Sequence, residues 1–135
     1  MFGGTSRGGM RAVDTNVLVR LITRDDAAQV AAAEAFVAPG AWVPHLALAE
    51  ATWVLAAVYD CDRNAIARAV EMLLNHQHLT LQDADAVTAA VRQLRGRSAV
   101  SFSDCLLVEV ARKAGHSPLG TFDRHLSKLD GAHRL

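Results

Sequence analysis

The sequence predicts an α/β domain with a central, mainly parallel sheet of four or five short strands flanked by helices. Short apolar runs alternate with longer helical patterns along the chain, as in a domain built from strand–helix–strand units. Hydrophobic residues make up 51% of the chain and aromatic residues only 5%, which favours tightly packed helices over a sandwich of strands. The 135 residues are enough for one domain with a real core.

Residues 1–9 differ in composition from the rest of the chain. Glycine, serine and threonine dominate them, and Met10 follows. We interpret them as a flexible leader, either a remnant of expression or a segment before an alternative start, and assign residues 10–135 to the domain.

Apolar spacing predicts the elements of the first half of the chain in order. Residues 11–13 are a strand candidate, and residues 16–22 and 27–37 are helices with apolar residues every three or four positions. Residues 41–44 are a short buried strand, and residues 45–59 are a long apolar helix. Candidate helix caps are Thr15 or Asn16 for the first helix and Asp25 or Asp26 for the second.

The second half repeats the alternation. Asp62 caps a helix over residues 63–75, and residues 79–81 are a strand candidate. Asp83 or Asp85 begins a helix that runs to about Leu94, and Ser101 or Ser103 begins one that runs to about Ala114 and ends at Gly115. The last elements are a strand over 118–121 and a helical turn over 124–129.

Four carboxylates stand where an acidic residue is locally unexpected. Asp14 and Asp123 each follow a strand candidate, and Asp104 lies in the first turn of an apolar helix. Glu50 is the only charged residue of 46–58. Sites in parallel sheets form beyond the carboxyl ends of the strands, so one end of the sheet is expected to gather Asp14, Asp104 and Asp123.

Each of these acids also has a simpler interpretation. Asp14, Asp104 and Asp123 suit the first turn or cap of a helix. Glu50 has only apolar neighbours three and four positions away on its helix, so we expect it to face the core. The alternatives for Glu50 are the solvated edge of a pocket, or a bond to His45 or a distant arginine.

The missing partner that these acids indicate is a divalent cation. Oxygen ligands without clustered cysteine or histidine favour Mg²⁺ or Mn²⁺ over Zn²⁺. Four carboxylates held together would repel one another, so such a set binds a cation or raises some of its own pKa values.

Composition restricts the class of protein further. The formal net charge is zero, which argues against a broad, non-specific binder of nucleic acid. Cys61 and Cys105 follow no metal or disulfide spacing, which favours a reducing, cytoplasmic setting. We find no signal peptide, and the longest apolar run is too short to span a bilayer.

The acidic motifs together resemble those of PIN-domain nucleases. Val13-Asp14-Thr15-Asn16-Val17-Leu18 is similar to the opening motif of that family. An isolated acid on the helix after the second strand, then Phe102-Ser103-Asp104 and Thr121-Phe122-Asp123, are similar to its later motifs in the same order. The resemblance covers roughly residues 10–135, and the small size is similar to VapC toxins of bacterial toxin–antitoxin pairs.

This resemblance implies a PIN fold and an Mg²⁺- or Mn²⁺-dependent endoribonuclease that is inhibited by a cognate VapB antitoxin. It also implies a homodimer. Asp14, Asp104 and Asp123 would contact metal directly or through water, while Glu50 would complete the site or orient the attacking water. Water attack would leave a 5′-phosphate and a 3′-hydroxyl. The supporting donors would be Thr15, Asn16, Ser103 and Thr121, and the candidates for RNA phosphate binding are Arg97, Arg112 and Arg124.

Two other functions remain open from the residues alone. A haloacid-dehalogenase-like phosphatase also has an aspartate after its first strand, but it needs a second acid two residues later, where this chain has Asn16. A non-catalytic module that binds RNA or an antitoxin would keep the acids for folding only.

Overall fold

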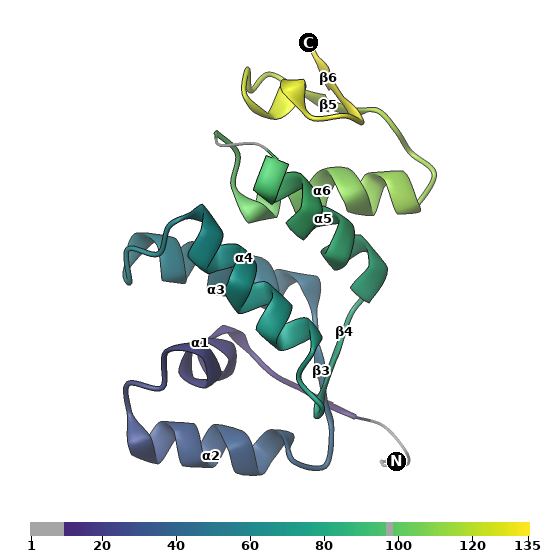
Figure 1. Cartoon of the computed structure of the whole chain (residues 1–135). Coiled ribbons are helices and arrows are strands. Elements are labelled where there is room, and N and C mark those ends of the chain that lie inside the picture. The colour runs from purple at the N-terminus through teal and green to yellow at the C-terminus, as the bar shows by residue number, and fades with distance from the viewer. Residues whose placement is uncertain (1–9, 97–98) are drawn as a thin grey trace.

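The computed structural model describes residues 10–96 and 99–135, in which short strands alternate with helices (Figure 1). The expected leader, residues 1–9, lies outside the described residues. In chain order the elements are β2 (Arg11–Ala12), α1 (Thr15–Thr23), α2 (Ala27–Val37), β3 (Ala41–Val43), α3 (His45–Ala57), α4 (Arg63–Leu74), β4 (Leu79–Leu81), α5 (Ala84–Gly96), α6 (Phe102–Lys113), β5 (Leu119–Thr121), the 3₁₀ turn η1 (Leu126–Lys128) and β6 (Ala132–Arg134). The predicted α/β class is confirmed, and β6 is an additional strand that the sequence did not indicate.

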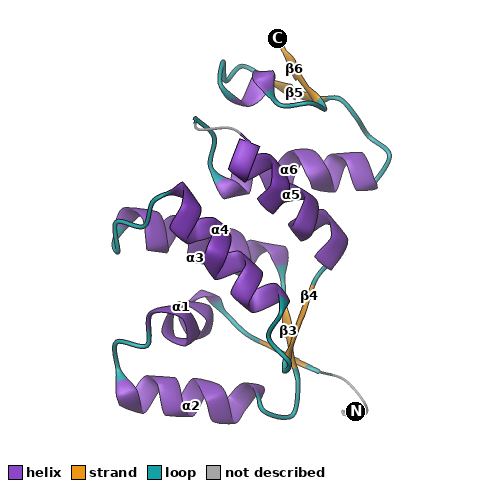
Figure 2. Ribbon diagram, viewed as in Figure 1, coloured by secondary structure: helices purple, strands orange, loops and turns teal. Residues whose placement is uncertain are grey.

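The described strands pair in parallel but belong to two sheets. Strand β3 is central in the first sheet, with β2 on one side and β4 on the other. Strands β5 and β6 form the second sheet. The two sheets lie at opposite ends of the molecule, with α3, α4, α5 and α6 between them (Figure 2). The strands therefore pair in parallel, as we expected, but they form two sheets instead of one central sheet.

Side-chain caps determine where several helices begin. Asp14 rather than Thr15 or Asn16 caps α1, because its carboxylate accepts the N–H of Val17. Asp26 caps α2 and Asp62 caps α4 in the same way. Each cap satisfies a backbone donor that the helix itself leaves without a partner.

Helix α6 is closed at its C-terminal end by Gly115. Gly115 has φ +84°, a left-handed conformation in which a β-carbon would be strained. Its N–H donates to the carbonyl of Arg112, and the N–H of His116 donates to that of Ala111. This pair of bonds closes the helix in a Schellman motif, as the sequence predicted for Gly115.

One hydrophobic core connects the helices to both sheets. Leu18, Leu48, Leu73 and Val108 come from four different helices and are almost fully buried. The second sheet is attached to the same core, since Leu126 and Leu129 are buried in it.

Arg112 also connects α6 to the C-terminal segment. Its Nη2 donates to the carbonyl oxygen of Asp130 at 2.7 Å, and its Nε donates to the buried carboxylate of Glu109 at 3.1 Å. At Gly131 a β-carbon would lie 2.6 Å from Nη2 of Arg112. Gly131 also has φ +94°, a left-handed conformation that strains a residue with a β-carbon, and this conformation favours glycine just before β6.

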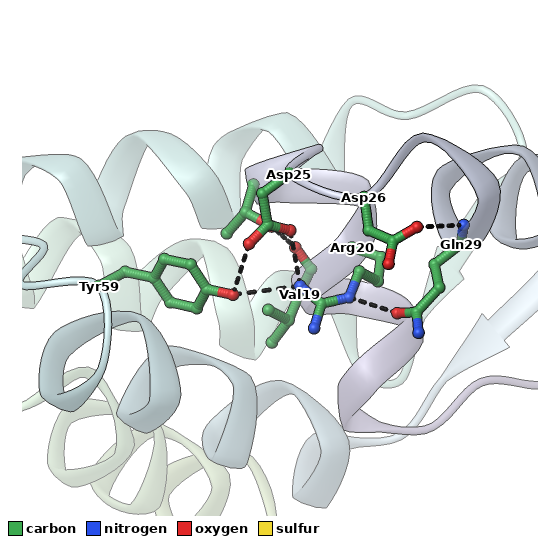
Figure 3. Close-up of polar contacts among 7 residues, drawn as sticks. Val19, Arg20, Asp25, Asp26, Gln29 and Tyr59 are labelled. Atoms are coloured by element: carbon green, nitrogen blue, oxygen red, sulfur yellow. Dashed lines mark hydrogen bonds and ion pairs between the residues drawn. The ribbon is translucent and has the colours of Figure 1, made fainter.

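A polar network holds α1 against the turn after α3 (Figure 3). Arg20 donates to Asp25 at 2.6 Å and to the hydroxyl of Tyr59 at 3.1 Å, and that hydroxyl donates to Asp25 at 3.0 Å. The pKa of Asp25 lies below its ordinary value, because Thr23 and Tyr59 donate to its carboxylate and Arg20 is close. The network joins segments that are 39 residues apart in the sequence.

Among the helices of residues 10–96 and 99–135, none combines the length and the apolar character that crossing a bilayer requires.

Replacing the single tyrosine tests this network. We expect Tyr59→Phe to lower the free energy of unfolding by about 1 kcal/mol, because the ring still packs while the hydroxyl bonds to Arg20 and Asp25 are lost. Urea denaturation at neutral pH measures the change. As a control, Glu34→Gln removes only the exposed ion pair with Arg24 and should change stability by less than about 0.5 kcal/mol. Equal effects of the two substitutions would contradict a structural role for the network.

Candidate active site

Asp14 lies where the first sheet meets α1. The N–H of Val13 donates to the carbonyl of Trp42 at 3.1 Å, which extends the pairing of β2 with β3 up to this point. The side chain of Asp14 is exposed, and one of its oxygens accepts the N–H of Val17 at 3.2 Å. The carboxylate is therefore held beyond the carboxyl end of a parallel strand, as the sequence predicted.

Glu50 lies beside the start of α1. Its Oε1 accepts the hydroxyl of Thr15 at 2.8 Å, a bond between residues 35 positions apart. Thr15 thus connects the segment of Asp14 to the middle of α3 by a bond to one of the four acids.

The expectation that Glu50 faces the core is wrong. Glu50 is exposed, and the buried face of α3 consists of Ala47, Leu48, Ala51, Thr52 and Leu55. The apolar neighbours Leu46 and Trp53 indicated a buried face of the helix, but they are themselves 71% and 68% exposed. Of the alternatives considered, a solvated position agrees with the structure.

Asp104 lies in the first turn of α6 and is half-buried. Ser101 is the cap of this helix and accepts the N–H of Asp104, and its hydroxyl lies 3.0 Å from that of Ser103. Burial, together with the charges of Asp104 and Glu109, raises the pKa of the Cys105 thiol to about 12. Cys105 therefore stays protonated at neutral pH and is no nucleophile.

Asp123 follows β5 in the second sheet. Its Oδ1 accepts the N–H groups of His125 and Leu126, both at 2.8 Å, and its own N–H donates to the hydroxyl of Thr121 at 3.0 Å. The bond from Leu126 is the main cause that lowers the pKa of Asp123, and the bond from His125 adds to it. The carboxylate is exposed and ionised at neutral pH.

The structure brings some of the four acidic segments together. Helix α3, which carries Glu50, contacts both α1 and α6. Asp123 lies at the end of β5, and Figure 1 shows this strand far from β2. Within the described residues no three acidic, histidine or cysteine side chains lie close enough to hold a metal ion. The expectation that one sheet end gathers Asp14, Asp104 and Asp123 is therefore wrong for this conformation.

The four acids fit a hard divalent cation by their chemistry but not by their spacing. All offer carboxylate oxygens, and among the described ion pairs none joins any of the four to a lysine or arginine. The premise that these acids lack a cationic partner is thus supported, whereas the premise that they are buried is not.

The three arginines expected to bind RNA have different surroundings. Arg97 lies outside the described residues. Arg112 already bonds to Glu109 and Asp130, which gives it a role within the fold. Arg124 is exposed beside Asp123. The remaining supporting residue, Asn16, is exposed on α1 and lines a shallow hollow between α1 and α2.

Sequence reasoning assigned no role to Arg63 or Glu109. The side chain of Glu109 is buried and bonds to Gln93 and Arg112. Nε of Arg63 is buried without a hydrogen-bond partner in the part of the chain that the structure describes. The available signal was that Arg63 ends a stretch from residue 25 to 62 that contains no lysine or arginine.

The depressed pKa of Asp123 predicts a dependence of stability on pH. Because the folded-state pKa is below the unfolded value of about 3.9, the stabilisation is complete above that value and is lost as pH falls through the folded-state pKa. We expect wild type to lose more stability than Asp123→Asn between pH 5 and pH 3, as measured by urea denaturation at each pH. An equal loss of stability in wild type and Asp123→Asn between pH 5 and pH 3 would contradict this assignment. So would an Asp123 carboxyl that titrates at its ordinary pKa by NMR.

Comparison with known proteins gives a family for the chain. The model of the PIN domain family matches residues 11–132, which is most of the sequence and includes all four acids. A search of curated proteins finds no match. The fold agrees with the family match, since residues 10–96 and 99–135 form six α-helices and short parallel strands. The extent of the match and this agreement show that the chain belongs to the PIN domain family.

Proposed function

We propose that this protein is a metal-dependent endoribonuclease that cleaves RNA phosphodiesters by water attack. PIN domains are generally metal-dependent nucleases, and this chain has their nuclease-type fold. The observation that carries the proposal is the pairing of Thr15 with Glu50, which fixes one acid of the set beside the segment of another, Asp14. These carboxylates have no described lysine or arginine partner and remain available to a cation.

In this proposal Asp14, Glu50 and Asp104, whose segments meet at α3, would bind Mg²⁺ or Mn²⁺, whereas Asp123 in the second sheet would take part only when the two sheets come closer together. When bound, such an ion lowers the pKa of a water ligand and offsets the charge of a phosphate. The chain's own contribution is orientation. The cap at Val17 holds Asp14, the hydroxyl of Thr15 holds Glu50, and the bonds to His125 and Leu126 hold Asp123.

We further propose that the protein is the toxin of a VapBC-type pair, neutralised by its cognate antitoxin and assembled as a homodimer. Exposed apolar side chains support a protein partner: Leu46 on α3, Leu107 on α6, and Phe122, which is 80% exposed. Large side chains of this kind are common at protein interfaces. Leu55 is buried and the hydroxyl of Tyr59 is engaged with Arg20 and Asp25, so neither side chain is counted among these exposed apolar residues.

A non-catalytic binding module of the same fold is the second candidate. The observation that favours it is the separation of the acids in the described conformation. In such a module Asp14 would serve only as the cap of α1, and Asp123 only to hold the turn before η1.

Asparagine substitutions separate these two functions, because asparagine caps a helix about as well as aspartate but is a poor ligand for a divalent cation. We expect Asp14→Asn combined with Asp104→Asn to reduce Mg²⁺-dependent cleavage of single-stranded RNA by at least about 100-fold, more than the loss of a supporting group causes. Cleavage by the wild type should leave a 5′-phosphate and a 3′-hydroxyl, which end-labelling detects.

Asp26→Asn is the matched control, because Asp26 caps α2 by the same type of bond and belongs to no proposed site. It should cleave RNA at the wild-type rate. The binding module would be favoured if neither the wild type nor the double variant cleaves RNA and both are equally harmless on expression. A 2′,3′-cyclic phosphate product would contradict water attack.

The partner is tested by co-expression with the product of the neighbouring gene. We expect the two proteins to purify as a complex in which RNA cleavage is suppressed, and the isolated chain to behave as a dimer in light scattering. Two separate proteins after co-expression would count against an antitoxin. A monomeric isolated chain would contradict the homodimer.

A further inference from the structure

A partly enclosed pocket lies beside two of the proposed catalytic acids. It is bounded by α3, the start of α4, the end of α5 and the start of α6, and its volume is about 240 Å³. Its walls are mainly apolar, with Ile66, Leu94, Val100 and Phe102 among the lining residues. Whole small-molecule sites usually measure about 300–1,000 Å³, so this pocket is suited to a smaller unit.

The pocket contains one cation that nothing in the described structure neutralises. Arg63 lines it, and Nε of this arginine is buried without a hydrogen-bond partner among residues 10–96 and 99–135. None of the described lining residues is acidic. A buried donor on a guanidinium is costly unless it is paired, so the pocket favours an anionic ligand.

A second group of donors also lines the pocket. Ser101 and Ser103 line the pocket at the N-terminal end of α6, where the helix dipole is positive. The Ser103 hydroxyl is exposed, and its only described hydrogen bond is the one to Ser101. An anion in the pocket would therefore have donors available from the start of α6 as well as from Arg63.

An aromatic ring completes the set. Trp53 lines the pocket and is 68% exposed, so most of its surface is free to stack. It lies one helical turn after Glu50, and Ser103 precedes Asp104 directly. The lining of the pocket therefore includes a near neighbour of each of these two acids. Stacking of a base on an aromatic side chain is a frequent source of affinity for single-stranded nucleic acid.

We propose that this pocket binds one nucleotide of the substrate strand. Arg63 and the serines at the start of α6 hold its phosphate, and the indole of Trp53 stacks on its base. The proposal rests on the proposed function, because it places the scissile strand next to Glu50 and Asp104. Stacking and phosphate contacts do not identify a base, so the pocket positions RNA without setting its sequence.

Tryptophan fluorescence tests the pocket without any cleavage. The chain has two tryptophans, so Trp42→Phe leaves Trp53 as the only reporter. In EDTA, adenosine 5′-monophosphate and a single-stranded tetra-adenylate should both change the Trp53 signal in a saturable way. Adenosine and inorganic phosphate should bind at least about tenfold more weakly, because each offers only half of the contacts.

Variants on this background assign the phosphate contact. Arg63→Gln should weaken binding of the monophosphate by about tenfold and leave adenosine unchanged, and Arg63→Lys should restore part of the loss. Arg68→Gln is the matched control, because Arg68 is exposed on the same helix and does not line the pocket. Thermal unfolding by circular dichroism identifies any variant that has lost its fold. If Arg63→Gln has lost its fold, the binding of Arg63→Lys is compared with that of the parent protein instead.

The outcomes separate this proposal from the nuclease activity. A chain that binds the monophosphate at Trp53 but never cuts RNA supports the pocket and contradicts the nuclease. A chain that cuts RNA while Trp53 does not respond overturns the pocket alone. Equal binding of adenosine and its monophosphate, or equal effects of Arg63→Gln and Arg68→Gln, also overturns it.

Discussion

Strand β3 is the constraint on which the rest of the fold depends. It pairs with β2 on one side and β4 on the other, and Ala41 and Val43 on its buried face have almost no exposed surface. Pro44 follows it and begins α3, so the register of β3 sets the position of Glu50 and Trp53 along that helix. The strand also sets the position of Asp14, because the carbonyl of Trp42 accepts the N–H of Val13, which directly precedes Asp14. Although β3 is only three residues long, it therefore determines the positions of Asp14 and Glu50 and of one wall of the pocket.

Local signals made most of the elements predictable. Helix starts followed from Asp26, Asp62 and Ser101, because a capping side chain acts within three residues of itself. Strand β6 was missed because its Ala-His-Arg sequence has neither alternation nor β-branched residues, and only its parallel pairing with β5 makes it a strand. The division into two sheets depends on long-range packing, in which Leu126 and Leu129 attach the last strands to the core, and no local pattern encodes it.

The sequence singled out the residues of the proposed site but not their arrangement. Chain order and spacing identified the four acids, and the structure confirms a solvated strand end for Asp14 and a first helical turn for Asp104. Glu50 was placed wrongly because α3 is apolar on both faces, so its neighbours could not indicate which face is buried. Arg63 has no motif around it. Its unpaired Nε becomes visible only when α3, α4 and the start of α6 are packed around it.

Capping and cation binding are compatible roles for these acids. Asp14 accepts its cap bond at Oδ1, and Asp123 accepts both of its bonds at Oδ1, so in each case the described hydrogen bonds leave Oδ2 free. A carboxylate has several lone pairs, and a bond to one oxygen orients the other. The N–H donors that fix Asp123 also lower its pKa, which keeps it charged at neutral pH. In the proposed site, the hydrogen bonds that hold one oxygen of the carboxylate would therefore orient the other toward a cation, and an asparagine that preserves these bonds removes only the charge.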